Sequence, residues 1–325
     1  MCPEKGKTGF RLIDMLVVIA VIGILVGMLV PAVVIVEEDA RQTHCSNKIR
    51  ALALAAMNFE ISRNRYPGYQ EINSADRPTS WAVQLLPYLE RPDLMDRWNS
   101  EMDFDYGTLM PALEIMVCDN VTTLDAGIPA TTYVANAGFY PPSQTQDALE
   151  AAQKPANGVF HDRISYAGKQ VSRSEIRDGL SNTLLVSENL SASRWPAIGN
   201  PLGGPDTPLS SFSGLPKKYF SHNRFGATFV WLYAGEPVDS GAADPLPVQP
   251  VMRINGELLT RPHVDADGPP SAEYAGLSAF HPDGVNAAFA DGSVKLLSNA
   301  LSYQAYQQLM TPHGAKSDAP VRVSP

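Results

Sequence analysis

The feature that most constrains this chain is an uncharged apolar run of 22 residues near its start, from Met15 to Val36. As an α-helix that rises about 1.5 Å per residue, the run would be about 33 Å long, enough to cross the roughly 30 Å apolar core of a bilayer. A buried helix of a soluble protein is the alternative, but such helices are usually shorter and keep a polar face. The run therefore predicts a single membrane-spanning helix.

The residues on either side of the run predict its orientation. A cleaved secretory signal would have a shorter apolar region ending in small residues, whereas this run ends at the acidic triplet 37–39. Lys5, Lys7 and Arg11 lie before it. Because basic flanks stay on the cytoplasmic side, we expect a cytoplasmic N-terminus and a C-terminal domain outside the cytoplasmic (inner) membrane, with display in a cell-surface filament as a further option.

One acidic side chain, Asp14, lies at the N-terminal edge of the apolar run. An ionisable group at a membrane edge is costly and is a candidate functional residue, although it can also simply mark the membrane boundary. A short basic leader ends at Gly9 and is followed by Phe10, Leu12, Ile13 and Asp14. This order resembles the signal of type IV pilins and type II secretion pseudopilins, in which a leader ending in Gly precedes Phe-Thr-Leu-Ile-Glu and an apolar helix.

The resemblance implies that a prepilin peptidase cuts between Gly9 and Phe10 and that the new amine is methylated. Asp14 would then pair with the Phe10 amine of a neighbouring subunit within membrane lipid, where low dielectric strengthens the attraction. Such pairs would set the register of helices in a filament or a type II secretion-like machine, built as a homo- or hetero-oligomer. Arg11 and Asp14 depart from the usual Thr and Glu, and the shorter Asp side chain has less reach.

The charge of the chain argues against a nucleic-acid partner. The formal net charge is −9, and removal of residues 1–9 takes away one Glu and two Lys, which leaves −10. Basic clusters, which nucleic-acid binding needs, are not found in the sequence. The 325 residues leave more than 250 for an extramembrane domain, enough for a sizeable core.

The cysteines suggest a disulfide. Cys2 lies in the leader, whereas Cys45 and Cys118 would remain in an exported compartment that permits disulfides. A Cys45–Cys118 bridge would close a loop of about 73 residues, contribute roughly 4 kcal/mol in the chain-entropy model, and tie the long helix to the domain behind it. Two free buried thiols are the alternative.

Local patterns predict the remaining elements. The long helix should continue beyond the membrane and end near residues 64–67, where Pro67-Gly68 is a strong breaker. Its outer part would bury a face made of Ile49, Leu52, Leu54, Ala55, Ala56 and Phe59. We expect a Ser-capped short helix at 80–90 and a final helix at 302–310. Four strands are expected at 113–118, 131–136, 183–186 and 227–233. A hairpin is expected at 285–297, with a two-residue loop at Asp291-Gly292. Long loops are predicted at 195–216 and 236–250.

A second resemblance rests on His281, followed after nine residues by Asp291-Gly292. This spacing is similar to the C-terminal signature of the DUF1559 family, which is abundant in planctomycetes. Further matching pieces follow in order from residue 9 to about 300, with both long loops unmatched. They include 30–33, 41–47, 80–90, 133–138, 157–160 and 176–183. One departure is at Cys118, which is followed by Asp119-Asn120 where the family often has Pro-Ser-Asp.

These patterns and resemblances together predict an α+β, pilin-like fold, in which a long N-terminal helix packs on an antiparallel β-sheet domain with long loop insertions. The expected parts are a prepilin leader (1–9), a transmembrane helix (10–36), its extramembrane continuation (37–66), a DUF1559-like globular domain (67–311) and a flexible tail (312–325).

Catalytic and cofactor motifs are not found in the sequence, so we expect no enzyme activity and no cofactor. His281 with Asp283 and Asp291 can hold a metal, but turn geometry explains the motif more simply as hydrogen bonding that pins the hairpin. Asp265 and Asp267 resemble part of a calcium loop, and they lack the distal Glu of an EF-hand.

Three functions remain open, of which an exported enzyme is the least favoured because the sequence shows no nucleophile–base or metal constellation. The favoured one is a structural pilin-like protein that polymerises or joins an export machine. The alternative is a membrane-tethered binding module, whose outer domain would hold a glycan or small solute on Trp195, Trp231, Tyr133 and Tyr140. Aromatic residues are more often part of a core than of a ligand site.

Overall fold

The computed structural model describes residues 12–100, 110–121, 129–141, 146–166, 170–192, 194–198, 227–232, 237–238, 246–247, 254–256 and 275–318. The chain divides into two compact units, Met1–Thr43 and His44–Pro325. Most of the long loop predicted at 195–216 lies outside the described residues, as do Gly9, Phe10, Asp265, Asp267 and the side chain of Asp14.

A single helix, α1 (Leu12–Arg63), begins in the first unit and ends in the second. It ends where the sequence predicts, because Asn64 adopts a left-handed conformation with φ of 56° and Pro67 cannot continue a helix. Among the described side chains of the first unit, 18 large apolar ones between Leu12 and Val36 are exposed, each by 49–83%. No helix in the described ranges combines the length and the apolar character needed to cross a membrane.

In the second unit, α1 buries one face in the core. Ile49, Leu52 and Ala56 are fully buried and follow one another at spacings of three and four residues, which bring them to one side of the helix. Leu54 was expected on this face but is 46% exposed. The expectation is wrong because a residue two positions from Leu52 points to another side of the helix.

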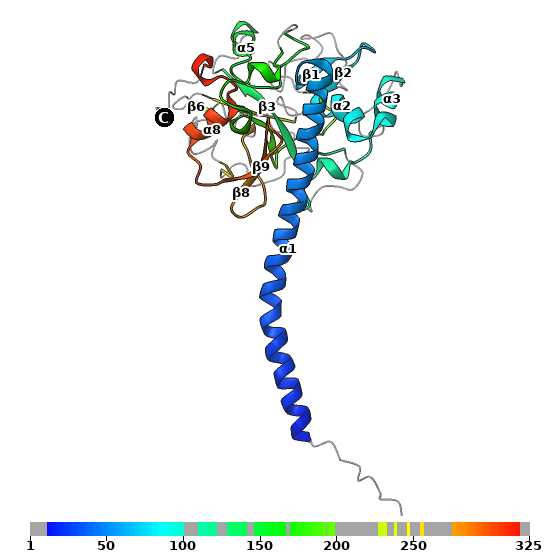
Figure 1. Cartoon of the computed structure of the whole chain (residues 1–325), viewed down its shortest axis with the longest axis vertical. Helices are drawn as coiled ribbons and strands as arrows, with labels where there is room; N and C mark the ends of the chain where they lie inside the picture. The colour runs from blue at the N-terminus through cyan, green and yellow to red at the C-terminus, as the bar shows by residue number, and fades with distance from the viewer. Residues whose placement is uncertain are drawn as a thin grey trace, which may run out of the picture. The chain divides into compact units, whose positions relative to one another are not determined.

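A five-stranded sheet forms the centre of the second unit (Figure 1). Its strand order is β5-β3-β4-β8-β9. The strands are β3 (Tyr133–Phe139), β4 (Leu184–Glu188), β5 (Thr228–Trp231), β8 (Gly284–Phe289) and β9 (Val294–Ser298). Every residue of the first four is buried, so both faces of the sheet are covered. The sheet is mixed rather than purely antiparallel, because β5 pairs parallel with β3 while the other three pairs are antiparallel.

The β8–β9 hairpin forms where the sequence predicts, but its loop has three residues instead of two. Phe289 N donates to Ser293 O at 2.9 Å, and Gly292 N donates to Phe289 O at 2.9 Å. Gly292 has φ of +82°, the left-handed position that follows a type I turn in three-residue hairpin loops. Asp291 accepts from the backbone N and hydroxyl of Ser293 and so fixes the turn.

Smaller elements surround the sheet. They are β1 (Gln70–Ile72), β2 (Pro78–Ser80), α2 (Trp81–Leu85), η1 (Leu86–Leu89), α3 (Pro92–Ser100), η2 (Glu114–Met116), α5 (Gln146–Ala152), η3 (Arg173–Glu175), η4 (Leu180–Asn182), α8 (Tyr303–Met310) and η8 (Gly314–Lys316). Ser80 caps α2 through its side chain, as expected, and Ser302 caps α8 in the same way. The strand expected at 113–118 is instead the 3₁₀ turn η2, and the pair β6 (Pro237–Val238) and β7 (Leu246–Pro247) lies in the segment predicted as a loop at 236–250.

The C-terminal segment adds contacts to the same unit. Tyr306 of α8 donates to Val230 O of β5 at 3.1 Å. Within the segment 312–325, expected to be a flexible tail, residues 312–318 are described. Asp318 there accepts from Lys154 Nζ and Asn157 Nδ2, each at 2.7 Å.

Candidate functional site

The candidate site is built around a disulfide between α1 and the domain that follows it. Cys45 on α1 and Cys118, just after η2, are joined by an S–S bond of 2.09 Å, with 4.9 Å between their Cα atoms. This is the pair that the sequence suggested. Both residues are buried, Cys45 completely and Cys118 to 3% exposure. The bridge therefore fastens the buried part of α1 to a segment 73 residues away.

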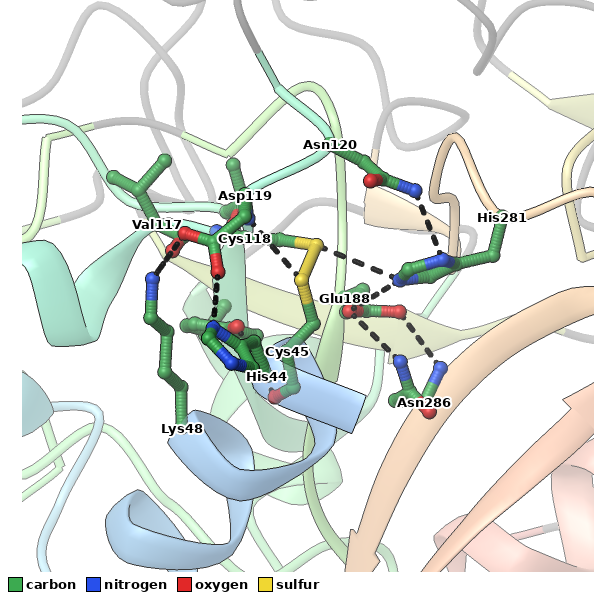
Figure 2. The surroundings of a disulfide bond; sticks show 12 residues. His44, Cys45, Lys48, Val117, Cys118, Asp119, Asn120, Glu188, His281 and Asn286 are labelled. Atoms are coloured by element: carbon green, nitrogen blue, oxygen red, sulfur yellow. Dashed lines mark hydrogen bonds and ion pairs between the residues drawn. A yellow bond between two sulfur atoms is a disulfide. The ribbon is translucent and has the colours of Figure 1, made fainter. Parts of the chain in front are cut away.

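A histidine and a carboxylate face the sulfur atoms (Figure 2). His281 Nε2 lies 3.5 Å from Cys118 Sγ and 3.4 Å from Glu188 Oε1. On the other side of the ring, Asn120 Nδ2 lies 3.1 Å from His281 Nδ1. His281 and Glu188 are each 2% exposed or less in their side chains. A carboxylate and an imidazole thus lie buried beside the disulfide.

The strands of the sheet hold Glu188 in place. It is the last residue of β4, and its Oε2 accepts a 2.7 Å hydrogen bond from the backbone N of Asn286 on β8. The Asn286 side chain donates to Oε1 at 3.3 Å. Charged hydrogen bonds of this kind partly replace the water that a buried carboxylate loses.

Two further groups contact Cys45. Asp119 N donates to Cys45 Sγ at 3.2 Å, and Tyr133 Oη donates to Cys45 O at 3.2 Å. Burial, followed by the negative charges of Glu188 and Asp119, raises the pKa of Tyr133 well above its ordinary value, so its hydroxyl remains a donor. The departure from the family pattern matters here, because a proline at position 119 has no N–H to donate to the sulfur.

Asp119 also forms the outer wall of the site. Its carboxylate pairs with Lys48 Nζ, which also donates to Val117 O at 3.1 Å, and it lies 3.5 Å from His44 Nδ1. Lys48 and His44 both come from α1. The segment after η2 is thus held to α1 by the Lys48–Asp119 ion pair as well as by the disulfide.

The remaining predicted site residues lie elsewhere. Asp283 and Asp291 are exposed turn residues, and Asp291 bonds to Ser293 rather than to His281. Glu188 and Asn120, which contact His281, were not singled out from the sequence. The one available signal for Glu188 was an acidic residue closing the apolar strand 184–186.

The aromatic residues considered for ligand binding are part of the core. Trp195, Trp231 and Tyr133 are fully buried, and Tyr140 is 4% exposed. The indole N–H of Trp231 donates to Asn157 O at 2.9 Å, and that of Trp195 to Pro111 O at 3.2 Å. These side chains support the sheet and its loops rather than a surface platform.

The sequence of the chain resembles those of known proteins. Residues 36–302 match the model of a family described as protein of unknown function (DUF1559). The chain belongs to the DUF1559 family. The resemblance seen in His281 and Asp291-Gly292 is thereby confirmed, and in this DUF1559 chain those residues begin and close the segment that contains β8.

Two curated proteins named for a secretion system are similar in sequence to part of the DUF1559 chain. It is 32% identical over 68 residues to "Type II secretion system core protein G" of Pseudomonas aeruginosa and 34% identical over 64 residues to the protein of that name from Aeromonas hydrophila. These stretches are 21% and 20% of this chain and 48% and 45% of the relatives. The chain thus spans about half the length of the curated relatives it matches. No solved structure matches it.

Proposed function

We propose that this DUF1559 protein is a membrane-anchored, exported structural protein of the pseudopilin type, without catalytic activity. The observation that carries the proposal is the 32–34% identity to type II secretion core protein G. In this proposal the N-terminus is cytoplasmic, and the second unit lies outside the cytoplasmic membrane, where an oxidising environment suits the Cys45–Cys118 bridge.

The first unit supports a membrane anchor. Its large apolar side chains are exposed from Leu12 to Val36, and the sequence has no charge between Met15 and Val36. Burying a leucine or valine side chain is worth about 1.5–3 kcal/mol. Membrane lipid, and the matching helices of other subunits, are the partners proposed to cover them.

Processing and assembly follow from the N-terminal motif. A prepilin peptidase would cut between Gly9 and Phe10 and leave a methylated amine on Phe10. Asp14 would pair with that amine on a neighbouring pilin-like subunit, because an unpaired carboxylate at the membrane edge is costly. The assembly would be a filament or a type II secretion-like machine.

The first test is intact-mass and N-terminal peptide analysis of the protein from its native membranes. A chain that starts at methylated Phe10 is the expected result. A chain that still starts at Met1 would remove the pseudopilin proposal and leave a plain single-span anchor.

Assembly is tested with variants at both ends of the apolar run. Asp14→Ala should abolish cross-linking between subunits while the protein stays in the membrane, and Asp14→Glu should retain it because Glu restores the usual pilin residue. Asp39→Ala, which removes an acidic group at the other end, is the matched control and should cross-link normally. Equal cross-linking in all three variants would rule out a role for Asp14.

The binding module for a glycan or small solute has less support. Trp195, Trp231, Tyr133 and Tyr140, the side chains proposed to hold such a ligand, are buried. Saturable binding of a glycan by the detergent-solubilised protein would nevertheless move this alternative to the front.

A further inference from the structure

The disulfide is surrounded by polar groups that a covalent cross-link does not need. The two sulfur atoms, His281 Nε2 and a carboxylate oxygen of Glu188 all lie within 4.8 Å of one another, and all four residues are buried. A disulfide needs neither an imidazole nor a carboxylate beside it. The pseudopilin proposal gives no role to His281 or Glu188.

The distances in this cluster match those of a tetrahedral zinc site. With Zn–N and Zn–O bonds of about 2.0–2.1 Å and Zn–S bonds of about 2.3 Å, the tetrahedron has edges of about 3.3 Å between N and O and about 3.6 Å between N and S. The observed separations are 3.4 Å from His281 Nε2 to Glu188 Oε1 and 3.5 Å from His281 Nε2 to Cys118 Sγ. Two of the six edges therefore already have the required lengths.

The sulfur atoms need only a small movement to complete the site. In a tetrahedral site two thiolates lie about 3.8 Å apart, farther than two sulfur atoms joined by a covalent bond. Cleavage of the S–S bond removes the constraint that holds them together. Rotation about the Cα–Cβ bonds of Cys45 and Cys118 can supply the rest.

The surrounding groups are those that orient ligands in metal sites. Glu188 is held by the backbone and side-chain N–H groups of Asn286. Asp119 N donates to Cys45 Sγ at 3.2 Å, an interaction that stabilises a thiolate. Asn120 sits on His281 Nδ1, and its amide can present either oxygen or nitrogen to the ring, so it can accept from Nδ1–H when Nε2 is a ligand.

We propose that reduction of the disulfide converts this pocket into a Zn²⁺ site with Cys45, Cys118, His281 and Glu188 as its four ligands. A dithiol reductant gives two electrons and two protons to the S–S bond, which becomes two thiols, and is itself oxidised to a disulfide. Zn²⁺ then displaces the two thiol protons to solvent and binds the thiolates. Two thiolates and one carboxylate carry a charge of −3, and the bound Zn²⁺ brings the net charge of the site to −1. The free-energy cost of burying these groups is therefore lower with the metal than without it.

The consequence is that α1 has two interchangeable fastenings to the domain. In an oxidising compartment the disulfide joins Cys45 to Cys118. In a reducing compartment, or before oxidation, Zn²⁺ joins the same two residues and adds His281 and Glu188. The metal thus keeps the helix attached when the covalent bond is absent.

The test uses the full chain in detergent micelles. Because both sulfurs are buried, the chain is unfolded, reduced and refolded with reductant, and then titrated with Zn²⁺ against a chromogenic chelator, and separately with Co²⁺. We expect one equivalent of metal per chain, with the ligand-field absorption of tetrahedral Co²⁺ and a thiolate-to-Co²⁺ charge-transfer band. The oxidised chain should show neither. Failure of the reduced chain to bind, or equal binding by the oxidised chain, would overturn the proposal.

Variants assign the ligands. His281→Ala and Glu188→Gln should each weaken Zn²⁺ binding by at least about tenfold and alter the Co²⁺ spectrum, while circular dichroism of the oxidised forms reports whether each variant folds. His44→Ala is the matched control, because His44 lies on the outer side of the site, 3.5 Å from Asp119, and is 70% exposed. Unchanged binding in folded His281→Ala would exclude that ligand. The wild-type Co²⁺ spectrum remains decisive if neither variant folds, and it is independent of whether N-terminal processing occurs.

Discussion

The two parts of helix α1 use similar apolar residues in opposite ways. In the first unit Leu25 is 57% exposed and its large apolar neighbours are exposed as well, whereas in the second unit Ile49 and Leu52 are fully buried. The first part is apolar on all sides, while the second alternates apolar residues with charged ones such as Lys48 and Arg50. Helix formation is common to both, so it is the distribution of side chains around the axis that decides what each part can pack against.

The largest effect is expected when the disulfide that joins the second part of α1 to the rest of the second unit is removed. Cys118→Ser removes the disulfide, and the free energy of unfolding of the second unit should fall by about 4 kcal/mol, because the unfolded chain loses a 73-residue cross-link. Urea unfolding without reductant and with a chelator present measures it. Cys2→Ser, made in the chain that keeps residues 1–9, is the control and should unfold as the wild type does. An unchanged midpoint in Cys118→Ser would show that the bridge adds nothing.

The next effect compares one leucine from each part of α1. Leu52→Ala should cost about 2–5 kcal/mol, since it leaves a cavity in a closed core. Leu25→Ala should leave the unfolding of the second unit unchanged, because Leu25 is exposed in the first unit. Urea unfolding of both variants in detergent decides the matter. Similar losses would mean that the two parts of α1 do not differ in packing.

A smaller effect on the free energy of unfolding is expected from the buried carboxyl group of Asp162. Burial raises the pKa of Asp162, despite hydrogen bonds to its side chain from Ser165, Gln70 and Ile164 that act the other way. A raised pKa in the folded state means that stability from this group is present below the unfolded pKa of about 3.9 and is lost as pH rises through the folded pKa. Asp162→Asn should therefore be more stable than wild type at pH 7, and this advantage should vanish below about pH 4.

The matched control for this prediction is Asp39→Asn, because Asp39 is an exposed carboxylate of the first unit. Its unfolding free energy should follow that of the wild type across the pH range. Asn at position 162 keeps an oxygen that can accept from Ile164 N and Ser165 N, now at 2.9 and 3.0 Å, so the substitution removes the charge while these two backbone hydrogen bonds remain. An Asp162→Asn advantage that persists at low pH would contradict the assignment.

The smallest effect is expected at the Glu37–Arg41 ion pair of the first unit. Both side chains are well exposed, by 59% and 46%. A double-mutant cycle with Glu37→Gln and Arg41→Gln should give a coupling energy below about 0.5 kcal/mol that decreases with salt. A coupling above about 1 kcal/mol would show that this part of α1 is less exposed to solvent than its side chains indicate.

Local chemistry explains which parts of the fold were predictable. The end of α1 at Asn64, the Ser80 and Ser302 caps and the turn at Asp291-Gly292 depend on residues within a few positions of one another. The prediction of a strand at 113–118 was wrong, because residues 114–116 form a 3₁₀ turn. In that turn Met116 O accepts a hydrogen bond from Thr132 N at 2.9 Å. A contact 16 residues away outweighs the local pattern.

The candidate site was predictable only in its cysteines. Counting cysteines and inferring an exported compartment suggests Cys45 with Cys118, because only two remain after the leader. The partnership of His281 with Glu188 joins residues 93 positions apart, on β4 and just before β8, and depends on which strands pair. The same holds for the parallel pairing of β3 with β5, since nothing in either segment encodes the direction of its partner.

The strand order also has a consequence for synthesis. β8 lies between β4 and β9, so the edge of β4 is without its partner until the 95 residues between Glu188 and Gly284 have been made. At about 5–20 residues per second, this takes roughly 5–20 s. An unpaired buried strand is prone to pair with other chains. Nascent chains stalled before Gly284 should therefore aggregate or recruit chaperones, whereas chains released after Ser298 should not, because the exposed edge of β4 persists until the last hairpin emerges.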